Sequence, residues 1–372
     1  MTPGIDSLCK KHADWLEGRR VGLVAHPASV NACGTPSAEY LRKNKVRLTA
    51  LFGAEHGYYG IGGAGEEIGP RKHPRWNIAI HSLYGDTRKP TPKMLRGIDT
   101  IVFDLQDLGA RCYTYVSTLR YILEAAAENK KEVIVADRPS PLANITDGPM
   151  LDPAFASFVA MIPAPVVYGM TPGETALWLK EKLKLKLDLR VAPMENYDRK
   201  TYKPSSRKWI PPSPAIKSWK CGLCFPITVF FEALPAVDHG RGTATPFQLF
   251  GAPWMNAKET SRALNKLDLP GLRFPPKNYK AMGGIKIDVT DPATFRPVAA
   301  AVAILHHLQE MYGMDRLWRA EGTRDEFFDK LMGTDSVRKA LQKGATPASI
   351  VRAWEPGLSA FAKERRKHLL YP

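Results

Sequence analysis

Short apolar runs rich in β-branched residues recur along the first half of the chain, and stretches with helical spacing separate them. The runs cover residues 21–26, 48–53, 100–105, 133–137 and 166–169, while residues 36–43 and 118–129 have the spacing of helices. Strands that alternate with helices in this way are typical of a parallel sheet with helices on both faces. The pattern therefore predicts a doubly wound α/β domain.

The pattern changes after residue 204, where Ser, Lys and Pro become frequent up to residue 220. Pro211, Pro212 and Pro214 in this stretch predict an ordered segment that crosses between two domains. We place the boundary so that the domains cover residues 1–207 and 208–372, and we expect the second to be a smaller α+β domain. Its predicted strands are residues 225–231 and 284–289, and its predicted helices are residues 297–311, 325–331 and 350–369.

The length and composition agree with this picture of two globular domains. The chain has 372 residues, of which 44% are hydrophobic and 24% charged, so intrinsic disorder is excluded. The longest apolar runs, residues 223–231 and 298–305, are shorter than the roughly 18 apolar residues of a membrane helix. Residues 1–15 contain no apolar signal core. Localisation stays open, periplasmic or secreted if an export signal was removed and cytoplasmic otherwise.

The net charge of +16 raises the question of a polyanionic partner. The basic residues are scattered, and no zinc finger, basic zipper or ribonucleoprotein motif occurs among them, so we predict a solvated basic surface and no nucleic-acid partner. Attraction to anionic cell-wall material is the alternative. Cys221 and Cys224 form a CxxC without the second pair of a zinc ribbon, and we expect them in the core. A labile disulfide or redox role is the alternative for them. We predict no metal and no cofactor.

Reactive side chains cluster where the predicted strands end. Because the carboxyl ends of parallel strands meet the ligand in such sheets, these side chains predict a shared cleft. They are Glu55 and His56 after the second run, Arg111 and Tyr113 after the third, Asp137 and Arg138 after the fourth, and Tyr168 and Glu174 after the fifth.

Two glycine-rich segments also point to this cleft. Residues 60–65 fit G-x-G-x-x-G, but they follow the second strand and open no helix, which favours an active-site loop over a dinucleotide site. Arg241 lies between two glycines, so it can approach an anionic ligand group closely. A solvated arginine in a flexible turn is the alternative for Arg241.

These motifs resemble a bacterial family, long of unknown function, whose characterised members are exo-β-N-acetylmuramidases of the NamZ type. The resemblance spans nearly the whole chain. It is carried by residues 21–24, 51–57, 82–85, 88–92, 104–115, 137–139, 147–149, 168–174, 231–232, 240–243, 246–247 and 365–371.

The resemblance implies a Rossmann-like N-terminal domain whose cleft with the C-terminal domain binds the terminal N-acetylmuramic acid of peptidoglycan fragments. The implied function is a glycoside hydrolase that releases this sugar during cell-wall turnover or recycling. The alternative is a non-catalytic binder of muropeptides or anionic sugars, and a third, weaker reading is a hydrolase of another anionic sugar. Oligomeric state and the stereochemical course stay open.

The chemistry of glycoside cleavage assigns roles to the candidate residues. Glu55 is the expected general acid, because a glutamate beside His56 and a glycine loop can be partly desolvated. The second role falls to Glu174, Asp137 or Glu66, or to the substrate's own 2-acetamido group oriented by Asp137. Arg111, Arg138 and Arg241 are the candidate partners of the lactyl carboxylate, and His56, Glu66, Tyr113, Tyr168 and Glu232 complete the predicted binding residues.

The sequence departs from the family pattern at four places. Residues 60–66 lack the two aspartates that the family carries, and Ala25-His26 replace the usual Thr-Asn. Ala215 stands where asparagine is usual, and Ala244 where aspartate follows Gly-Arg-Gly-Thr. Since the candidate acids and arginines remain, these changes favour altered specificity over lost catalysis.

Overall fold

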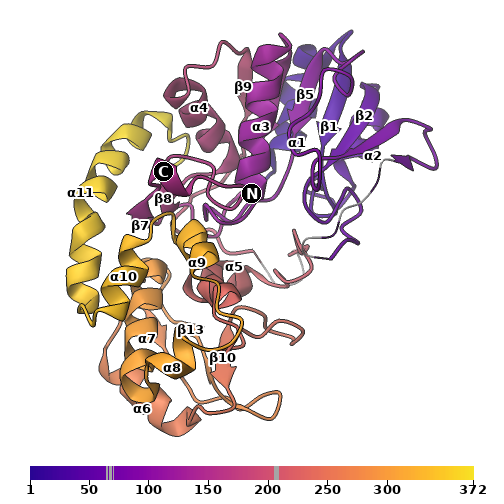
Figure 1. Ribbon diagram of the computed structural model, residues 1–372. Helices are drawn as coiled ribbons and strands as arrows, with labels where there is room; N and C mark the ends of the chain where they lie inside the picture. Colours follow the sequence, from indigo (N-terminus) through magenta and orange to yellow (C-terminus); the bar gives the residue numbers. More distant parts are fainter. Residues whose placement is uncertain (64–65, 67–68, 70, 205–208) are drawn as a thin grey trace.

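The computed structural model describes residues 1–63, 66, 69, 71–204 and 209–372, and a seven-stranded sheet dominates its first half (Figure 1). All neighbouring strands are parallel except the edge strand β3. In spatial order the strands are β3 (Arg71–Lys72), β4 (Ala79–Ser82), β2 (Arg47–Gly53), β1 (Arg20–Val24), β5 (Thr100–Phe103), β6 (Glu132–Ala136) and β9 (Leu189–Ala192).

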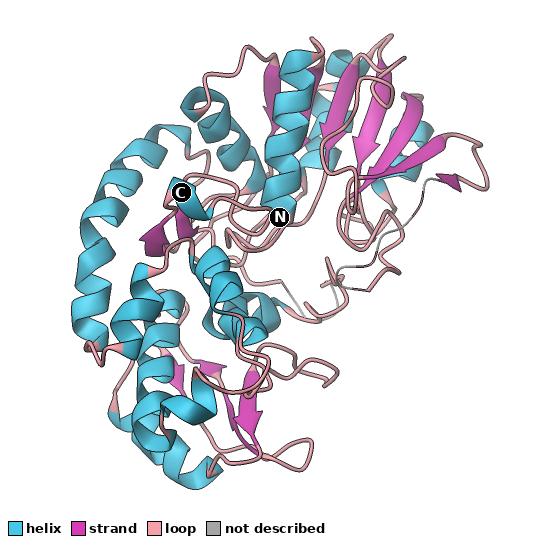
Figure 2. Cartoon of the chain, viewed as in Figure 1, coloured by secondary structure: helices cyan, strands magenta, loops and turns pink. Residues whose placement is uncertain are grey.

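Helices cover both faces of this sheet (Figure 2). On one face, α1 (Gly4–Lys11) and α2 (Ser37–Lys43) bury Ile5, Leu8 and Leu41 against the strands. On the other face, α3 (Tyr115–Glu128) and α4 (Pro172–Lys182) pack against β6. The predicted doubly wound, Rossmann-like α/β class is thereby confirmed.

The prediction that residues 166–169 form a fifth strand of the parallel sheet is wrong. Residues 165–167 form β8 (Pro165–Val167), but β8 pairs antiparallel with β7 (Asp147–Met150) in a separate small sheet. Two parallel strands of the large sheet, β4 and β9, were not among the predicted runs. A short apolar run has the same pattern in any buried strand, so periodicity cannot tell which sheet it joins.

The second half of the chain is a smaller α+β region, as predicted. Two antiparallel strand pairs, β10 with β12 and β11 with β13, lie among helices. The strands are β10 (Leu249–Ala252), β11 (Leu272–Arg273), β12 (Gly283–Lys286) and β13 (Asp288–Val289). The helices are α5 (Trp219–Thr228), α6 (Ala257–Lys266), α7 (Pro297–Tyr312), α8 (Met314–Leu317), α9 (Asp325–Met332), α10 (Ser336–Gln342) and α11 (Pro347–Arg365).

The strand predicted for residues 225–231 is wrong. These residues belong to α5 and to the following 3-10 turn η4 (Val229–Ala233). The Ser218 hydroxyl accepts a 3.2 Å hydrogen bond from the Cys221 amide and so caps α5. Because residues 221–228 are all buried, the helix has no polar face, and its apolar run cannot be told from a buried strand.

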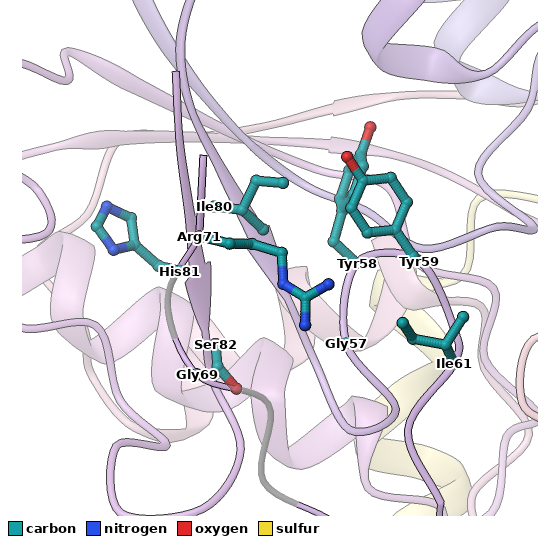
Figure 3. A pocket seen from close by; sticks show the side chains of 9 residues that line it. All are labelled: Gly57, Tyr58, Tyr59, Ile61, Gly69, Arg71, Ile80, His81 and Ser82. Carbon is teal, nitrogen blue, oxygen red and sulfur yellow. The ribbon is translucent and has the colours of Figure 1, made fainter. Parts of the chain in front are cut away.

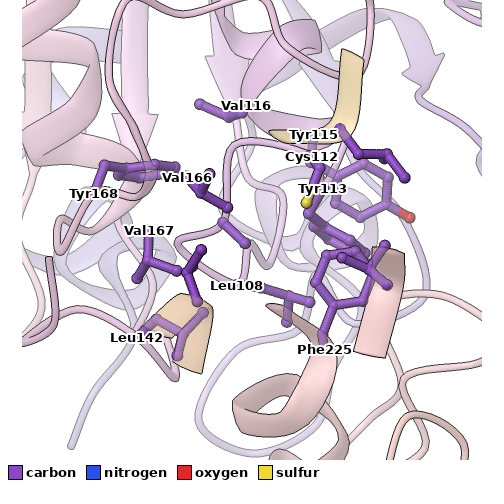
Figure 4. Close-up of a cluster of buried hydrophobic side chains, with 14 of the residues drawn as sticks. Leu108, Cys112, Tyr113, Tyr115, Val116, Leu142, Val166, Val167, Tyr168 and Phe225 are labelled. Carbon is purple, nitrogen blue, oxygen red and sulfur yellow. The ribbon is translucent and has the colours of Figure 1, made fainter. Parts of the chain in front are cut away.

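One continuous apolar core joins the two halves of the chain. Leu108, Leu142 and Tyr168 from the first half pack in the same cluster as Phe225 from α5 (Figure 4). Among the described residues, no helix combines the length and the apolar character needed to cross a bilayer.

Candidate active site

A cavity of about 570 Å³, here named the Glu55 cavity, lies between the carboxyl ends of the strands and the second half of the chain. Both halves contribute to its wall, as expected for a cleft at a domain junction. The side chains that matter for chemistry are Glu55, His56, Tyr84, Arg88, Tyr113 and Thr114 from the first half and Glu232, Arg241, Arg324, Phe327 and Lys330 from the second.

Glu55 follows β2 and is half-buried in the cavity wall. The Thr114 hydroxyl donates a 2.6 Å hydrogen bond to its Oε2 atom. Tyr84 also hydrogen-bonds to this carboxylate, and the pKa of Tyr84 is raised by burial and by the charge of Glu55. The carboxylate is therefore held in one orientation by two hydroxyl groups.

A tight turn aims His56 into the same cavity. Its backbone has φ of 70°, in the left-handed region, and Gly57 follows with φ of 75°. A Cβ on Gly53 would lie 2.2 Å from the Tyr58 amide nitrogen, so this close return of the chain requires glycine. His56 Nδ1 is 2.9 Å from the Gly62 carbonyl oxygen, which ties the imidazole to the glycine-rich loop.

Glu232 faces the cavity from η4 and pairs with Arg241, whose Nη2 donates to Glu232 Oε1. Burial raises the pKa of Glu232, Arg241 opposes this shift, and the charge of Glu55 adds to it. The charge of Glu55 thus contributes to the environment of Glu232, which lines the same cavity. Both predicted residues of the second half, Glu232 and Arg241, therefore line the same cavity as Glu55 and His56.

Tyr113 also lines the cavity, and its hydroxyl has no hydrogen-bond partner among the described residues although it is buried. The ring packs edge-on against Tyr115 and Phe225, with centroid separations of 4.8 and 5.6 Å (Figure 4). An unpaired buried hydroxyl costs free energy, so a ligand that pairs with it gains affinity.

Asp137 and Glu174, the other predicted catalytic acids, do not line the cavity. Both side chains are fully buried, and both receive hydrogen bonds from the end of the chain. The Tyr371 hydroxyl donates to Asp137 Oδ2 at 2.7 Å, and the Leu370 amide donates to Glu174 Oε1 at 2.7 Å. Burial and the charge of Glu174 raise the pKa of Asp137 to about 6.

Further contacts fix both acids in structural positions. Glu174 forms a capping box with Thr171 at the start of α4 and an ion pair with Arg199 at 2.5 Å. Asp137 Oδ1 accepts from the Gly173 amide at 2.8 Å. Asp137 and Glu174 therefore hold residues 370 and 371 against the first half of the chain, and neither acid lines the Glu55 cavity.

Arg111 is likewise removed from the cavity. Its side chain is fully buried, and its guanidinium donates to the carbonyl oxygens of Pro149, Ala164 and Met332 at 3.3, 2.5 and 2.6 Å. A Cβ on Gly333 would lie only 2.0 Å from Arg111 Nη2. Arg111 therefore joins segments that are distant in the sequence.

Arg138, Tyr168 and Glu66 also lie outside the Glu55 cavity. Arg138 makes a 2.5 Å ion pair with buried Asp104 and borders a different cavity, while the Tyr168 hydroxyl donates to Asp107. Glu66 is exposed, and its Oε2 accepts from the Gly63 amide at 2.7 Å. Residues 64 and 65 of the predicted glycine-rich loop lie outside the described residues.

A small recess lies beside the described part of that loop. Tyr58, Tyr59, Arg71 and Ile80 surround it (Figure 3). Its volume of about 10 Å³ holds about one water molecule, so it cannot take a sugar.

Residues 209–216 form the crossing segment. Trp209 and Ile210 line the separate cavity that Arg138 borders, and residues 213–216 line the Glu55 cavity. His26 fixes the crossing segment, because its Nδ1 is 3.0 Å from the Pro212 carbonyl oxygen while its Nε2 accepts from the Gln106 amide at 2.8 Å. The Tyr115 hydroxyl donates to the same Pro212 carbonyl at 2.7 Å. His26, one of the departures from the family pattern, is thus a structural residue.

The cysteines of the predicted CxxC lie in a helix. Cys221 and Cys224 are free thiols buried in α5. In the ranges that the structure describes, no three His, Cys, Asp or Glu side chains are grouped so that they could hold a metal ion.

Several residues that line the cavity were not among the candidate residues predicted from the sequence. Thr114, Tyr84 and Arg88 lie in segments that match the family pattern, and that was their only signal. Arg324 directly precedes α9 and Lys330 lies within it, and neither has a motif around it, so only the fold brings them to the site.

Comparison with known proteins identifies relatives along the whole chain. The family models for the N-terminal and C-terminal parts of the exo-beta-N-acetylmuramidase NamZ match residues 21–220 and 223–371. The peptidoglycan beta-N-acetylmuramidase NamZ of Bacillus subtilis is 36% identical over 99% of this chain and 91% of its own length.

Two crystal structures of DUF1343 family proteins from Bacteroides fragilis have the same fold. The first has a TM-score of 0.92 and 31% identity, and it covers 100% of this chain and 99% of its own. The second has a TM-score of 0.77 and 25% identity, covering 100% of this chain and 98% of its own.

Proposed function

The chain belongs to the exo-β-N-acetylmuramidase NamZ family, and we propose that it is a peptidoglycan exo-β-N-acetylmuramidase whose active site is the Glu55 cavity. It acts as a glycosidase in cell-wall turnover. The observation that carries the assignment of the site is the position of Glu55 and Glu232, two carboxylates in the wall of one cavity of about 570 Å³. A cavity of this size accommodates a monosaccharide unit.

Glu55 is the proposed general acid. Glycoside cleavage requires a carboxyl group that protonates the leaving oxygen as the bond to the anomeric carbon breaks. Thr114 and Tyr84 hold the Glu55 carboxylate while leaving it in the cavity wall. The same group then accepts a proton from the water that attacks the anomeric carbon.

Glu232 is the proposed partner of the sugar's 2-acetamido group. Among the described residues, Glu55 and Glu232 are the two carboxylates that line the cavity. Glu232 Oε1 is occupied by Arg241, and Oε2 takes no hydrogen bond from the described residues. We infer that Oε2 accepts the acetamido N–H and so orients the amide oxygen toward the anomeric carbon, as in substrate-assisted hydrolysis.

This proposal replaces Asp137, Glu174 and Glu66 in the second role. Asp137 and Glu174 are enclosed and fully engaged with the end of the chain. Glu66 lies exposed beside Gly63. Tyr113 and His56 remain proposed binding residues, because both line the cavity.

The division into domains also stays a proposal. The predicted boundary between residues 207 and 208 lies outside the described residues. We keep two domains, since the family models for the two parts meet at residues 220–223.

The deciding experiment compares p-nitrophenol release from the N-acetylmuramide and the N-acetylglucosaminide by wild type and Glu55→Gln. Wild type is expected to cleave the muramide, and the variant to lose about 100- to 10,000-fold in kcat. Glu128→Gln, at the exposed end of α3, is the matched control and should keep full activity. Muramic acid that binds in calorimetry without any turnover would instead support the non-catalytic binder.

A further inference from the structure

Arg324 lines the Glu55 cavity, although no sequence motif marked it as a binding residue, and its contacts suggest a role for it. Resting on the proposed function, we propose that Arg324 binds the carboxylate of the lactyl ether of N-acetylmuramic acid. This carboxylate is the only charge that distinguishes the muramide from the glucosaminide. The residue that binds it therefore sets the specificity of the enzyme.

The arginines predicted for this task are occupied elsewhere. Arg111 is enclosed by backbone carbonyl groups, and Arg138 is paired with Asp104 outside the cavity. Arg241 lines the cavity, but its guanidinium is paired with Glu232. An arginine already paired with a carboxylate offers less to a second one, because the charges are compensated.

Arg324 is held in place without such compensation. Its amide donates to the Ala233 carbonyl at 2.9 Å, and its Nη2 donates to the Glu232 carbonyl oxygen. Its guanidinium stacks over the Phe327 ring, 4.5 Å from the centroid. No carboxylate within the described ranges forms an ion pair with it, and the side chain is exposed at the cavity wall. It is thus a preorganised donor without an anionic partner.

The neighbouring side chains on α9 support the same site. Phe327, Lys330 and Leu331 lie three and four residues apart, so one face of α9 presents all of them to the cavity. Lys330 pairs with Glu326 at 3.7 Å, but both groups are well exposed, and such pairs contribute little. Lys330 can therefore turn toward an anion that Arg324 holds.

The charge of the cavity wall favours an anionic ligand. The described residues that line it include Arg88, Arg241, Arg324 and Lys330 but only the two carboxylates of Glu55 and Glu232. Arg88 stacks over Phe158 at 4.5 Å, so its contacts are with residues of the first half. Arg324 is next to Glu232, whose carboxylate it influences, so the lactyl site lies beside the acetamido site. On the sugar ring the two substituents are also adjacent.

The test measures affinity for N-acetylmuramic acid and for its lactamide, in which an uncharged amide replaces the carboxylate. Calorimetry with wild type, Arg324→Gln and Arg324→Lys gives the dissociation constants. We expect wild type to bind the acid about 10- to 100-fold more tightly than the amide. Arg324→Gln should bind both equally, as weakly as wild type binds the amide, and Arg324→Lys should be intermediate.

Matched variants separate this result from a general loss of structure. Arg319→Gln removes an exposed guanidinium that pairs with Asp315 outside the cavity, and it should keep the wild-type preference. A preserved preference in Arg324→Gln, or its loss in Arg88→Gln or Lys330→Gln instead, would overturn the proposal. If wild type shows no turnover of the muramide, the proposed function fails; if it turns over the muramide without preferring the acid, only the lactyl site fails.

Discussion

The Thr114 hydroxyl lies 2.6 Å from Glu55 Oε2 and donates a hydrogen bond to it. Thr114 precedes α3, and Glu55 follows β2, so the bond connects the start of the helix to the segment after the strand. Together with Tyr84, Thr114 fixes the orientation of the Glu55 carboxylate in the cavity wall. Orientation of this kind is part of what lowers the barrier of an enzyme reaction.

Replacing Thr114 tests this orientation directly. Thr114→Val keeps the shape of the side chain and removes the donor, and hydrogen bonds to charged groups contribute about 1.5–3 kcal/mol. We expect kcat on the muramide to fall about 10- to 100-fold with little change in KM. Thr114→Ser should restore most of the activity, because it keeps the hydroxyl. A full rate in Thr114→Val would mean that Thr114 does not position the acid.

Glu232→Gln tests the acetamido role. The amide oxygen can still accept from Arg241, but the negative charge beside the reacting amide is lost. We expect a fall in kcat of at least about 100-fold and weaker inhibition by a thiazoline that mimics the cyclised intermediate. Glu326→Gln, on the exposed side of α9, is the control. Unchanged thiazoline inhibition in Glu232→Gln would refute the assignment.

Arg111→Lys separates a structural from a binding role. Lysine cannot reach three carbonyl groups in the geometry of a guanidinium, so the free energy of unfolding should fall by about 3 kcal/mol. The thermal midpoint measures this loss. KM for the muramide should stay within about twofold of wild type for the folded fraction, since Arg111 does not line the cavity. A raised KM with unchanged stability would place Arg111 at the substrate.

His26 predicts a pH dependence of stability. Burial lowers its pKa to about 3, below the 6.5 of an ordinary histidine, so the unfolded chain binds a proton that the folded chain does not. The stability that this group contributes is present above pH 6.5 and is lost as the pH falls toward 3. Between pH 6.5 and 4 the loss amounts to about 3 kcal/mol.

Urea unfolding of His26→Asn at several pH values measures this contribution. The variant cannot take up the proton, so its stability should change less between pH 6.5 and 4 than that of wild type. Parallel curves for the two proteins would show that His26 does not remain neutral in the fold.

Asp137→Asn tests the structural reading of a residue that the sequence marked as catalytic. An amide cannot accept every hydrogen bond that Asp137 receives from Tyr371, Thr171 and the Gly173 amide. We expect a lower thermal midpoint, faster amide hydrogen exchange at Leu370, and kcat within about threefold of wild type. Tyr371→Phe removes one donor and should loosen the end with the same retained kcat. A collapse of kcat in Asp137→Asn alone would return Asp137 to the chemistry.

Local sequence signals predicted the elements of the fold well, because each depends on residues close together in the chain. The runs at residues 48–53 and 133–137 became β2 and β6 within one residue at each end. The run at residues 225–231 failed, because an apolar segment buried on all sides has no periodicity to read. Capping by Ser218 was the available signal for α5.

The candidate site was predicted only in part, because local sequence signals locate strand ends but not the distant residues that contact them. A polar residue after a strand is brought to the sheet edge, and Glu55 and His56 follow this rule into the cavity. Asp137 obeys the same rule, but its partner Tyr371 is 234 residues away in the sequence. Whether a strand-end acid meets substrate or another part of the chain is decided by such distant contacts. Arg324 shows the converse, a residue without local signal that the fold carries to the site.

The contact of Tyr371 with Asp137 also bears on how the protein is made. Tyr371 leaves the ribosome 234 residues after Asp137, which at ordinary rates of translation is a delay of roughly 10–50 s. During that time the Tyr371 hydroxyl and the Leu370 amide, which donate to Asp137 and Glu174, have not yet been synthesised. The contacts that these two acids make with residues 370 and 371 therefore form only after the C-terminal part has been translated, so the N-terminal domain reaches its final packing last.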